Sequence, residues 1–479
     1  MNKDLIIIFG NFNIIHPGHL RLFRYAKSFN KEVRIGLFSD DYAKDDLLIG
    51  EEYRLEALKA NSYIDKCFLV NQPIEEIILE HKPFAVLKGK EYENASNPET
   101  SALNSYGGKL IFSSGDVSFS SIDLLRKEYF DSNRIHLTPP RDFISRHKIT
   151  ETDLLQIIDK FQNVKACILG DIIVDEYIDS EPLGMSQEDP TIAIKPLSSR
   201  KFIGGAGIVA MHGDRLGADV NFMTVLGEDE RQDFVHQEFQ KTNINANFLI
   251  DPFRPTTLKS RYRAKNKTLL RVNDVSEITI SESLQETILL EFSKIANTIN
   301  VLIFSDFNYG FLPTNLVKKI TEIAKVNNIL VLADSQSSSQ TGDIARYKSV
   351  HLITPTEREA RISQRDNQEG LVQLAKDLMD STQCQNIFLK LGEEGVFMHI
   401  GGTDQHETDQ INALNSAPID TAGAGDSLLI TSALCIAAGA TIWQTALLGS
   451  IAAAIQVSRV GNIPITKDEI IEAVKSFKF

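Results

Sequence analysis

Short apolar runs recur along the chain, and each is followed by a turn and then by a segment with helical spacing. Runs this short and this apolar are typical of strands buried on both faces of a parallel sheet. The clearest of these runs are residues 6–9, 33–38, 85–87, 166–169, 302–304, 331–333 and 388–389. Strands that alternate with helices of ordinary length predict an α/β fold, with helices covering both faces of each sheet.

Two apolar stretches could be taken for membrane segments. The first, residues 5–9, is too short for a signal peptide and predicts a buried strand. The second, residues 428–457, is interrupted by Gly439, Gln444 and Gly449, so two buried helices are expected instead of one membrane span. We therefore expect a cytoplasmic protein without a membrane partner.

Composition narrows the classes of function. A chain of 479 residues, 42% hydrophobic and 24% charged, predicts a globular protein of two or three domains. The net charge of −14 argues against nucleic acid as a partner, so an anionic substrate must be held by local donors. The cysteines are far apart in the sequence and suggest neither a zinc site nor a disulfide framework: Cys67, Cys167, Cys384 and Cys435.

A polar, proline-bearing stretch at residues 131–141 has the character of a linker, and residues 142–149 read as its extension. Thr150 and the acidic residues after it form a capping signal for a helix that runs through Phe161. The sequence therefore divides into a first domain of residues 1–135, a linker of residues 136–149 and a second domain of residues 150–479.

The second domain ends with a glycine-rich turn, Asp420-Thr421-Ala422-Gly423-Ala424-Gly425-Asp426, which precedes an apolar helical pattern. The small residues leave backbone N–H groups accessible to a phosphate, and the start of a helix favours an anion at the same place. Asp426 could then take a proton from an attacking hydroxyl. A plain turn with a capping aspartate is the alternative reading.

The first domain carries a different anion signature. His16-Pro17-Gly18-His19 lies between a buried strand and a helical pattern, so its two histidines point toward one spot near a helix start. Gly18 would let a phosphate approach the backbone. A capping histidine beside a solvated one is the alternative, and a metal site would need more ligands than this segment offers.

The turn at residues 420–426 resembles the C-terminal signature of ribokinase-like (PfkB) sugar kinases. The resemblance implies that Asp426 is the catalytic base and that Thr421, Gly423, Ala424 and Gly425 bind phosphate. It extends to other segments, which imply a Mg²⁺-organising Glu359, a turn beside ATP with Gly392 and Gly395, and a small β-lid over the sugar. The implied sugar-binding positions are Asp175, Gly204, Gly205, Lys259, Arg271 and Asp306. The basic residues near them suggest a phosphorylated sugar, with a solvated strand face as the alternative.

Residues 10–19 resemble the HxGH signature of the nucleotidyltransferase superfamily. In that family the histidines hold the phosphates of a nucleoside triphosphate, and an acceptor that is itself a phosphate needs no base. The resemblance implies catalytic roles for His16, His19 and Lys44. It also implies nucleotide or phosphate binding by Gly10, Phe12, Gly18, Lys88, Ser120 and Ser121.

Together, the two signatures resemble the bifunctional heptose-phosphate kinase/adenylyltransferase family that makes ADP-heptose for lipopolysaccharide, but in reversed order. The leading hypothesis is a bifunctional enzyme: its kinase phosphorylates a sugar or sugar phosphate with Mg²⁺-ATP, and its first domain transfers a nucleotide to the sugar 1-phosphate. The expected fold is α/β, with a Rossmann-like first domain and a three-layer ribokinase-like second domain. The resemblance also implies a homodimer through the lid.

Two alternatives stay open. The first domain could be a cytidylyltransferase for a polyol or amino-alcohol phosphate that uses CTP, fused to a kinase for a related small molecule. The chain could instead be a non-catalytic nucleotide-binding regulatory protein. This last reading is motivated by Asn13, Ile208 and Thr356, which stand where the resembling families usually carry aspartate, asparagine and asparagine.

Overall fold

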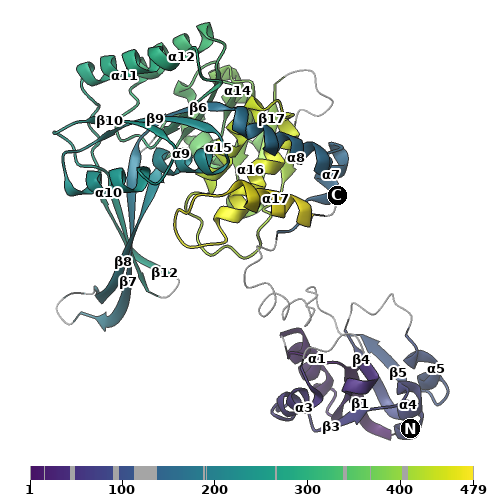
Figure 1. The fold of residues 1–479 in the computed structure, drawn as a ribbon. Coiled ribbons are helices and arrows are strands. Elements are labelled where there is room, and N and C mark those ends of the chain that lie inside the picture. Colours follow the sequence, from purple (N-terminus) through teal and green to yellow (C-terminus); the bar gives the residue numbers. More distant parts are fainter. Residues whose placement is uncertain are drawn as a thin grey trace. The chain divides into compact units, whose positions relative to one another are not determined.

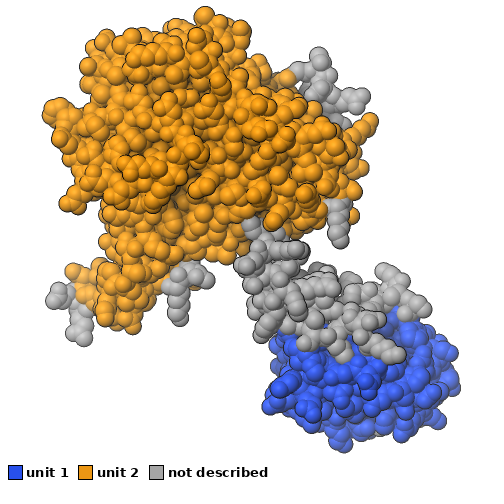
Figure 2. Space-filling model, viewed as in Figure 1, with its two compact units in different colours: residues 1–136 blue, residues 137–479 orange. Residues whose placement is uncertain are grey.

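The structure is a computed structural model of the chain. It describes residues 2–15, 17–43, 49–89, 97–112, 137–186, 189, 191–264, 267–337, 342–366, 368–401, 408–477 and 479. The chain forms two compact units, residues 1–136 and residues 137–479, which are coloured separately in Figure 2.

The described strands of the first unit form one parallel sheet with the order β3-β2-β1-β4-β5. The strands are β1 (Asn2–Gly10), β2 (Glu32–Phe38), β3 (Lys66–Val70), β4 (Pro83–Lys88) and β5 (Lys109–Phe112). The helices between them are α1 (Pro17–Lys27), α2 (Asp40–Ala43), α3 (Glu51–Lys59), α4 (Ile74–His81) and α5 (Glu99–Asn104). The central strand β1 is buried at Leu5, Ile6, Ile7 and Ile8, which explains its uninterrupted apolar run.

The second unit is built on a nine-stranded sheet with the order β10-β9-β6-β13-β14-β15-β16-β17-β18. Its strands are β6 (Lys165–Gly170), β9 (Asp219–Leu226), β10 (Asn245–Ile250), β13 (Val301–Asp306), β14 (Leu330–Ser335), β15 (Leu352–Ile353), β16 (Asn386–Lys390), β17 (Val396–Ile400) and β18 (Thr408–Ile411). Pairing is parallel from β10 to β16 and antiparallel from β16 to β18. The parallel part places the carboxyl ends of β6, β13, β14 and β16 along one edge.

A second, four-stranded sheet with the order β12-β11-β7-β8 forms the predicted lid. Its strands are β7 (Ile172–Met185), β8 (Ile192–Gly205), β11 (Leu258–Ala264) and β12 (Lys267–Asp274). Figure 1 shows these strands extending from the body of the second unit. Because β7 follows β6 after a single residue, Asp171, the lid begins at the edge where the main strands end.

Helices cover both faces of the main sheet. Apolar residues of α11 (Glu282–Ile295), α12 (Thr314–Val326) and α14 (Leu371–Thr382) share one core with alternate residues of β6, β13, β14 and β16. Helices α9 (Ala206–Arg215), α15 (Ala424–Ala437) and α16 (Ile442–Gln456) also contact the strands of this sheet. The other helices are α8 (Glu151–Lys160), α10 (Glu230–Phe239), α13 (Glu357–Gln364) and α17 (Lys467–Ser476). Among the described residues, none of the helices is long and apolar enough to traverse a bilayer.

Residues 137–149, expected to belong to the linker, fold with the second unit. They include α7 (Arg141–Arg146), whose Phe143 is buried. The His147 ring stacks on Trp443 at 4.0 Å between ring centroids, and its Nε2 lies 2.7 Å from the Asp409 carboxylate. The polar and proline-bearing composition of this segment concealed two aromatic anchors, and these attach it to α16 and β18.

Candidate active site

The glycine-rich turn of the second unit has the shape that the sequence predicted. Gly423 has φ 78° and precedes the first residue of α15, and a Cβ atom there would lie 2.8 Å from the Asn462 Oδ1. Only glycine therefore adopts this conformation without strain and without a clash. Ala424 and Gly425 form the start of α15, where unpaired N–H groups and the helix dipole favour a phosphate.

Asp426 lies in the first turn of α15 and is 6% exposed. Its Oδ1 accepts a hydrogen bond of 3.2 Å from the Gln336 Nε2. Burial and the neighbouring Asp334 raise the pKa of Asp426 to about 7, against the opposing attraction of Lys390. A carboxyl group with a pKa near neutrality is suited to accept a proton at physiological pH. Gln336, the residue after β14, therefore orients this carboxyl group.

Lys390 is a candidate functional residue that the sequence analysis missed. Its Nζ donates to both oxygens of Asp334 at 2.8 and 3.0 Å, and a Cβ atom at Gly425 would lie 3.1 Å from the same nitrogen. Although burial lowers the pKa of the Lys390 ammonium, attraction by Asp334 and Glu359 outweighs it and keeps the pKa above its usual value. A fixed positive charge therefore lies beside the phosphate turn. The only sequence signal was a lysine at the end of a buried strand, a pattern that many solvated strand ends share.

Glu359, the predicted magnesium residue, has a structural role. Its side chain completes a capping box with Thr356 at the start of α13, and its Oε1 accepts from the Ser337 N–H at 2.8 Å. The carboxylate oxygens of Glu359 keep further lone pairs beside these hydrogen bonds. Mg²⁺ that is bound to nucleotide phosphates needs only one or two carboxylate ligands from the protein. Among the described residues no cluster of three potential ligands forms a dedicated metal cage. Glu359 thus fits Mg²⁺ carried by ATP, and its role in binding it stays a prediction.

Three of the predicted sugar-binding residues, Asp175, Gly204 and Gly205, lie on the lid strands β7 and β8. Asp175 is 4% exposed, its Oδ2 accepts from the Asn462 Nδ2 at 2.9 Å, and its Oδ1 lies 3.2 Å from the Arg261 Nη2. A Cβ atom at Gly204 would lie 2.2 Å from the Asp175 Oδ2, so that position requires glycine. Gly205 has φ 60° and precedes α9. This group therefore places one carboxylate and one guanidinium next to each other at the base of the lid.

Two more predicted residues lie on the lid strands β11 and β12. The Lys259 ammonium lies 5.1 Å from the ring centroids of both Phe307 and Tyr309, an arrangement that favours a cation. Arg271 is exposed on β12, opposite Arg261 in the strand ladder. Lys259 therefore belongs to the base of the lid, whereas Arg271 lies on its exposed surface.

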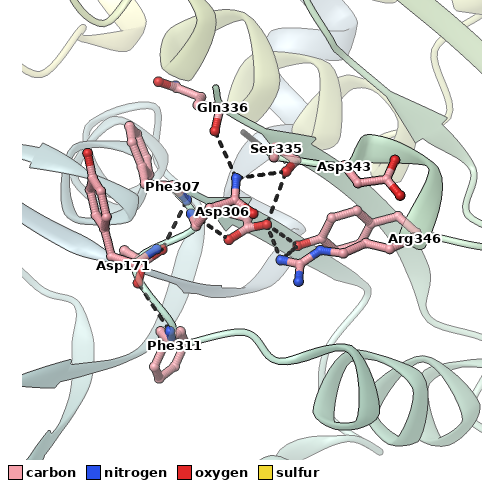
Figure 3. A network of polar contacts seen from close by, with 12 residues as sticks. Asp171, Asp306, Phe307, Phe311, Ser335, Gln336, Asp343 and Arg346 are labelled. Atoms are coloured by element: carbon pink, nitrogen blue, oxygen red, sulfur yellow. Dashed lines mark hydrogen bonds and ion pairs between the residues drawn. The ribbon is translucent and has the colours of Figure 1, made fainter. Parts of the chain in front are cut away.

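Asp306, another predicted sugar residue, is the centre of the polar network in Figure 3. Its Oδ2 accepts from the Ser335 and Tyr347 hydroxyls at 3.1 and 2.9 Å, and Arg346 forms an ion pair with it. Its Oδ1 accepts from the Asn308 N–H at 3.0 Å. With 1% of the residue exposed, these contacts give Asp306 a structural role, and sugar binding by it stays a prediction.

Asp171 fixes the loop that follows Asp306. Its carboxylate accepts from the backbone N–H groups of Phe307, Tyr309 and Phe311, at 3.0, 3.4 and 3.4 Å (Figure 3). Burial and repulsion by Asp306 raise the pKa of Asp171 to about 6. The loop therefore presents the two aromatic rings that face Lys259 in a defined orientation.

In the first unit, the histidine signature is described in part. The His19 Nδ1 lies 3.1 Å from the Ile14 carbonyl oxygen, so that nitrogen carries the proton and donates. The ring packs against Phe12, with 4.9 Å between centroids, and Phe12 is buried with φ 46°. A Cβ atom at Gly10 would lie 2.9 Å from the Phe12 ring, which explains the glycine. Gly18 lies in α1, and His16 lies outside the described residues.

Two other residues of this unit, the predicted Lys88 and the buried Arg54, have defined partners. The Lys88 Nζ donates to the Glu99 Oε1 at 2.8 Å, and Glu99 is 2% exposed. Arg54 is 1% exposed and donates to the carbonyl oxygens of Asn11, Phe38 and Ile49 at 2.7, 3.0 and 2.8 Å. Arg54 therefore ties together the ends of β1 and β2. Lys44, Ser120 and Ser121 lie outside the described residues, so the roles predicted for them stay predictions.

Comparison with known proteins gives two family matches. The pfkB family carbohydrate kinase model matches residues 164–468, and the cytidylyltransferase-like model matches residues 7–107. The "Bifunctional protein HldE" of Campylobacter jejuni (serotype O:2) is 32% identical over 322 residues, which cover 66% of this chain and 65% of that protein. The protein of the same name from Trichlorobacter lovleyi is 28% identical over 322 residues, covering 66% and 64%. The chain thus spans slightly less than two thirds of the length of these relatives.

Among solved structures, Escherichia coli phosphofructokinase-2 in complex with substrates and products is similar with a TM-score of 0.55 and 13% identity. The match covers 66% of this chain and 100% of the phosphofructokinase-2 chain. A ribokinase from Thermotoga maritima matches with a TM-score of 0.50 and 19% identity, over 65% and 99% of the two chains. At these identities the likeness concerns the fold alone, and it supports the ribokinase-like architecture of the second unit.

Proposed function

We propose a bifunctional role for this chain, which belongs to the pfkB family of carbohydrate kinases and carries a cytidylyltransferase-like unit before its kinase. The kinase unit phosphorylates a sugar or sugar phosphate with ATP, at the anomeric hydroxyl. The first unit then couples the sugar 1-phosphate to a nucleotide and releases pyrophosphate. A heptose phosphate is the proposed sugar, since the curated relatives at 32% and 28% identity carry the name HldE, the bifunctional family that the sequence resembles.

The kinase step is a phosphoryl transfer from ATP to a hydroxyl group. Asp426 takes the proton of that hydroxyl, its oxygen forms a bond to the γ-phosphorus, and the bond to the β-phosphate oxygen breaks to release ADP. The N–H groups of Gly423, Ala424 and Gly425 stabilise the negative charge of the transferring group. Mg²⁺ bound to the ATP phosphates, with Glu359 as its protein contact, would neutralise further charge.

The second step needs no catalytic base. An oxygen of the sugar 1-phosphate is already ionised and attacks the α-phosphorus of the nucleotide, and the bond to pyrophosphate breaks. His16, His19 and Lys44 stabilise the charge of the departing pyrophosphate. The His19 contact with the Ile14 carbonyl fixes the orientation of its ring and supports this role.

One observation carries the kinase proposal: the buried carboxyl group of Asp426 stands at the start of an apolar helix, directly after a turn without large side chains. Lys390 adds a fixed positive charge beside Gly425. A turn with accessible N–H groups, a buried carboxyl group and a buried ammonium group lie together here. This combination favours phosphate chemistry over other functions.

The proposal is tested by incubating the protein with Mg²⁺-ATP and a series of heptose and hexose phosphates, followed by mass spectrometry. We expect a product with one added phosphoryl group and a second product that carries a nucleotide. Absence of both products for every sugar phosphate, together with tight nucleotide binding, would favour the regulatory reading instead.

A second candidate concerns the nucleotide of the first unit. Its family model is cytidylyltransferase-like, which favours CTP and an alcohol phosphate as acceptor. Separate incubations with ATP and CTP, with pyrophosphate release as the readout, distinguish this candidate from the leading proposal. Release with CTP and a polyol phosphate, and none with ATP and a sugar 1-phosphate, would replace the leading proposal.

We also propose that the protein forms a homodimer through its lid. Large apolar side chains are exposed on β7 and β8: Leu183 (63%), Met185 (62%), Ile192 (55%) and Leu197 (63%). Exposed apolar patches of this kind usually mark an interface. Light scattering should give twice the chain mass, and Leu183→Lys with Leu197→Lys should reduce it to the mass of one chain. An unchanged mass in that variant would exclude the lid as the interface.

A further inference from the structure

A chain of polar contacts connects the lid with the phosphate turn of the second unit. Its members come from four segments: Asp175 and Tyr177 from β7, Arg261 from β11, Asp420 from the turn, and Gly461 with Asn462 from the loop after α16. We call these six residues the lid–turn ring. It begins and ends at Asp175, the proposed sugar-binding carboxylate, and it passes through the first residue of the phosphate turn.

One side of the lid–turn ring includes the hydroxyl group of Tyr177. Tyr177 is 1% exposed and its ring packs edge-on against Phe202. The hydroxyl donates to the Asp420 Oδ2 at 2.7 Å and accepts a hydrogen bond from Arg261. Arg261 in turn forms the ion pair with Asp175. A buried tyrosine of a lid strand therefore contacts the phosphate turn directly.

Asp420 connects Tyr177 to the backbone of the turn. Its Oδ1 accepts from the Ala422 N–H at 3.2 Å, and its Oδ2 also accepts from the Gly461 N–H at 3.1 Å. Although burial opposes it, the hydrogen bonds from Tyr177, Gly461 and Ala422 hold the pKa of Asp420 below its usual value. The carboxylate is therefore charged, and hydrogen bonds to a charged acceptor are the stronger kind.

The other side of the lid–turn ring includes Asn462. Its Nδ2 donates to Asp175, while a Cβ atom at Gly423 would lie 2.8 Å from its Oδ1. Asn462 is 7% exposed, and its Oδ1 has no hydrogen-bond partner among the described residues. Gln456 donates to the carbonyl oxygens of both Ala422 and Gly461, so turn and loop are joined. The same asparagine thus touches the sugar side and the phosphate side of the site.

We propose that Tyr177 is a positioning residue for phosphoryl transfer: its hydroxyl group ties the lid to Asp420 and so holds the phosphate turn in its anion-binding shape. Tyr177 acts through Asp420 and need not touch either substrate. The position of the lid relative to the turn is therefore fixed. A sugar held at Asp175 and a phosphate held at Gly423 are then kept at a defined distance and orientation. The catalytic part of this inference rests on the proposed kinase function, whereas the structural part does not.

The structural part is tested without any substrate. Tyr177→Phe removes one oxygen atom and keeps the packed ring, and Tyr262→Phe in β11 makes the same change elsewhere in the lid. Hydrogen–deuterium exchange followed by mass spectrometry reports on peptides that contain residues 420–426. We expect exchange in this turn to become about tenfold faster in Tyr177→Phe, because a hydrogen bond to a charged carboxylate is lost, and to stay unchanged in Tyr262→Phe.

The catalytic part is tested by the kinase rate with Mg²⁺-ATP and the sugar phosphate that the unaltered protein phosphorylates. Tyr177→Phe should lower kcat about tenfold or more and change the KM for the sugar phosphate by less than about threefold, because Asp175 keeps Arg261 and Asn462. Unchanged exchange in residues 420–426, equal acceleration throughout the second unit, or a rise in KM at constant kcat would each overturn the inference. If the unaltered protein phosphorylates no sugar, the proposed function fails, and the exchange experiment alone decides this inference.

Discussion

The two units are proposed to hold phosphate in different ways. In the first unit the predicted donors are side chains: His16 and His19, three residues apart in one motif, and Lys44. In the second unit the proposed donors are backbone N–H groups of a turn without large side chains, and charged residues around it are buried in pairs such as Lys390 with Asp334. The first arrangement is local in sequence, whereas the second is assembled from β7, β11, β14, β16 and α15.

The difference bears on what each site requires of the fold. A local motif works as long as one strand and one helix are in place, so its chemistry depends on few distant contacts. A site made of backbone groups depends on everything that fixes the backbone, including Asn462 at Gly423 and Tyr177 at Asp420. We therefore expect substitutions far from the chemistry to weaken the kinase more than the nucleotidyltransferase.

Separate loss of the two activities gives the largest expected effect. Asp426→Asn removes the base, so the kinase rate should fall by about a hundredfold to ten-thousandfold, while nucleotidyl transfer to a supplied sugar 1-phosphate continues. His16→Ala should have the opposite pattern. The readouts are ADP formation and pyrophosphate release, each measured with its own substrates. A native kinase rate in Asp426→Asn would refute the assignment of the base, and equal loss of both activities would indicate misfolding.

The second prediction concerns the stability of the first unit alone. Arg54→Met leaves three partly buried carbonyl oxygens without their donor, which should destabilise that unit by about 3 kcal/mol. Hydrogen exchange should then accelerate in β1 and β2 but not in β6 or β13. Lys59→Met, an exposed substitution on the same helix, is the matched control. Equal exchange in Arg54→Met and Lys59→Met would show that Arg54 does not hold the strand ends together.

The third prediction tests the buried cation of the kinase. Lys390→Met removes the positive charge that opposes the effect of burial on the pKa of Asp426, so ionisation of the base becomes less favourable. The kinase kcat/KM at pH 7 should fall roughly tenfold to a hundredfold, and nucleotidyl transfer should not change. Lys376→Met on the exposed face of α14 serves as the control. A rate like that of the control would mean that Lys390 is a structural residue only.

The smallest effect is expected from pH in the unaltered protein. The pKa of Asp426 is raised to about 7, and the base must be ionised to accept a proton. The kinase kcat/KM should therefore be near half its plateau at pH 7 and should fall about tenfold for each further unit of acidification. Asp426 plays no part in nucleotidyl transfer, so that reaction should lack this dependence. A kinase rate that stays flat between pH 6 and pH 8 would contradict the assignment.

Much of the fold could be predicted from the sequence because its signals are local. Buried strands such as residues 6–9 are uninterrupted apolar runs, and Gly439 between two apolar helices marks their boundary. The glycines at positions 423 and 204 also stood out in the sequence. In the structure, a Cβ atom at either position would come too close to a neighbouring side chain. The family resemblance, confirmed by the two family matches, supplied the order of the two units.

The contacts that complete the kinase site could not be predicted in the same way. Tyr177 and Asp420 are 243 residues apart in sequence, and Lys390 and Asp334 are 56 residues apart. A lone lysine at a strand end or a tyrosine in a lid strand carries no local pattern that distinguishes it from an ordinary packed or solvated residue. Likewise, Phe143 and His147 anchor a segment whose prolines and polar residues suggested a linker.

The central claim, two independent phosphate reactions in one chain, is tested most directly by complementation. Asp426→Asn and His16→Ala are incubated separately and as a mixture with Mg²⁺-ATP, CTP and the accepted sugar phosphate, and the nucleotide-sugar is measured by mass spectrometry. We predict none of this product from either variant alone and its recovery in the mixture, since each variant supplies the step that the other lacks. Failure of the mixture to form it, while the unaltered protein does, would contradict the account of two independent sites.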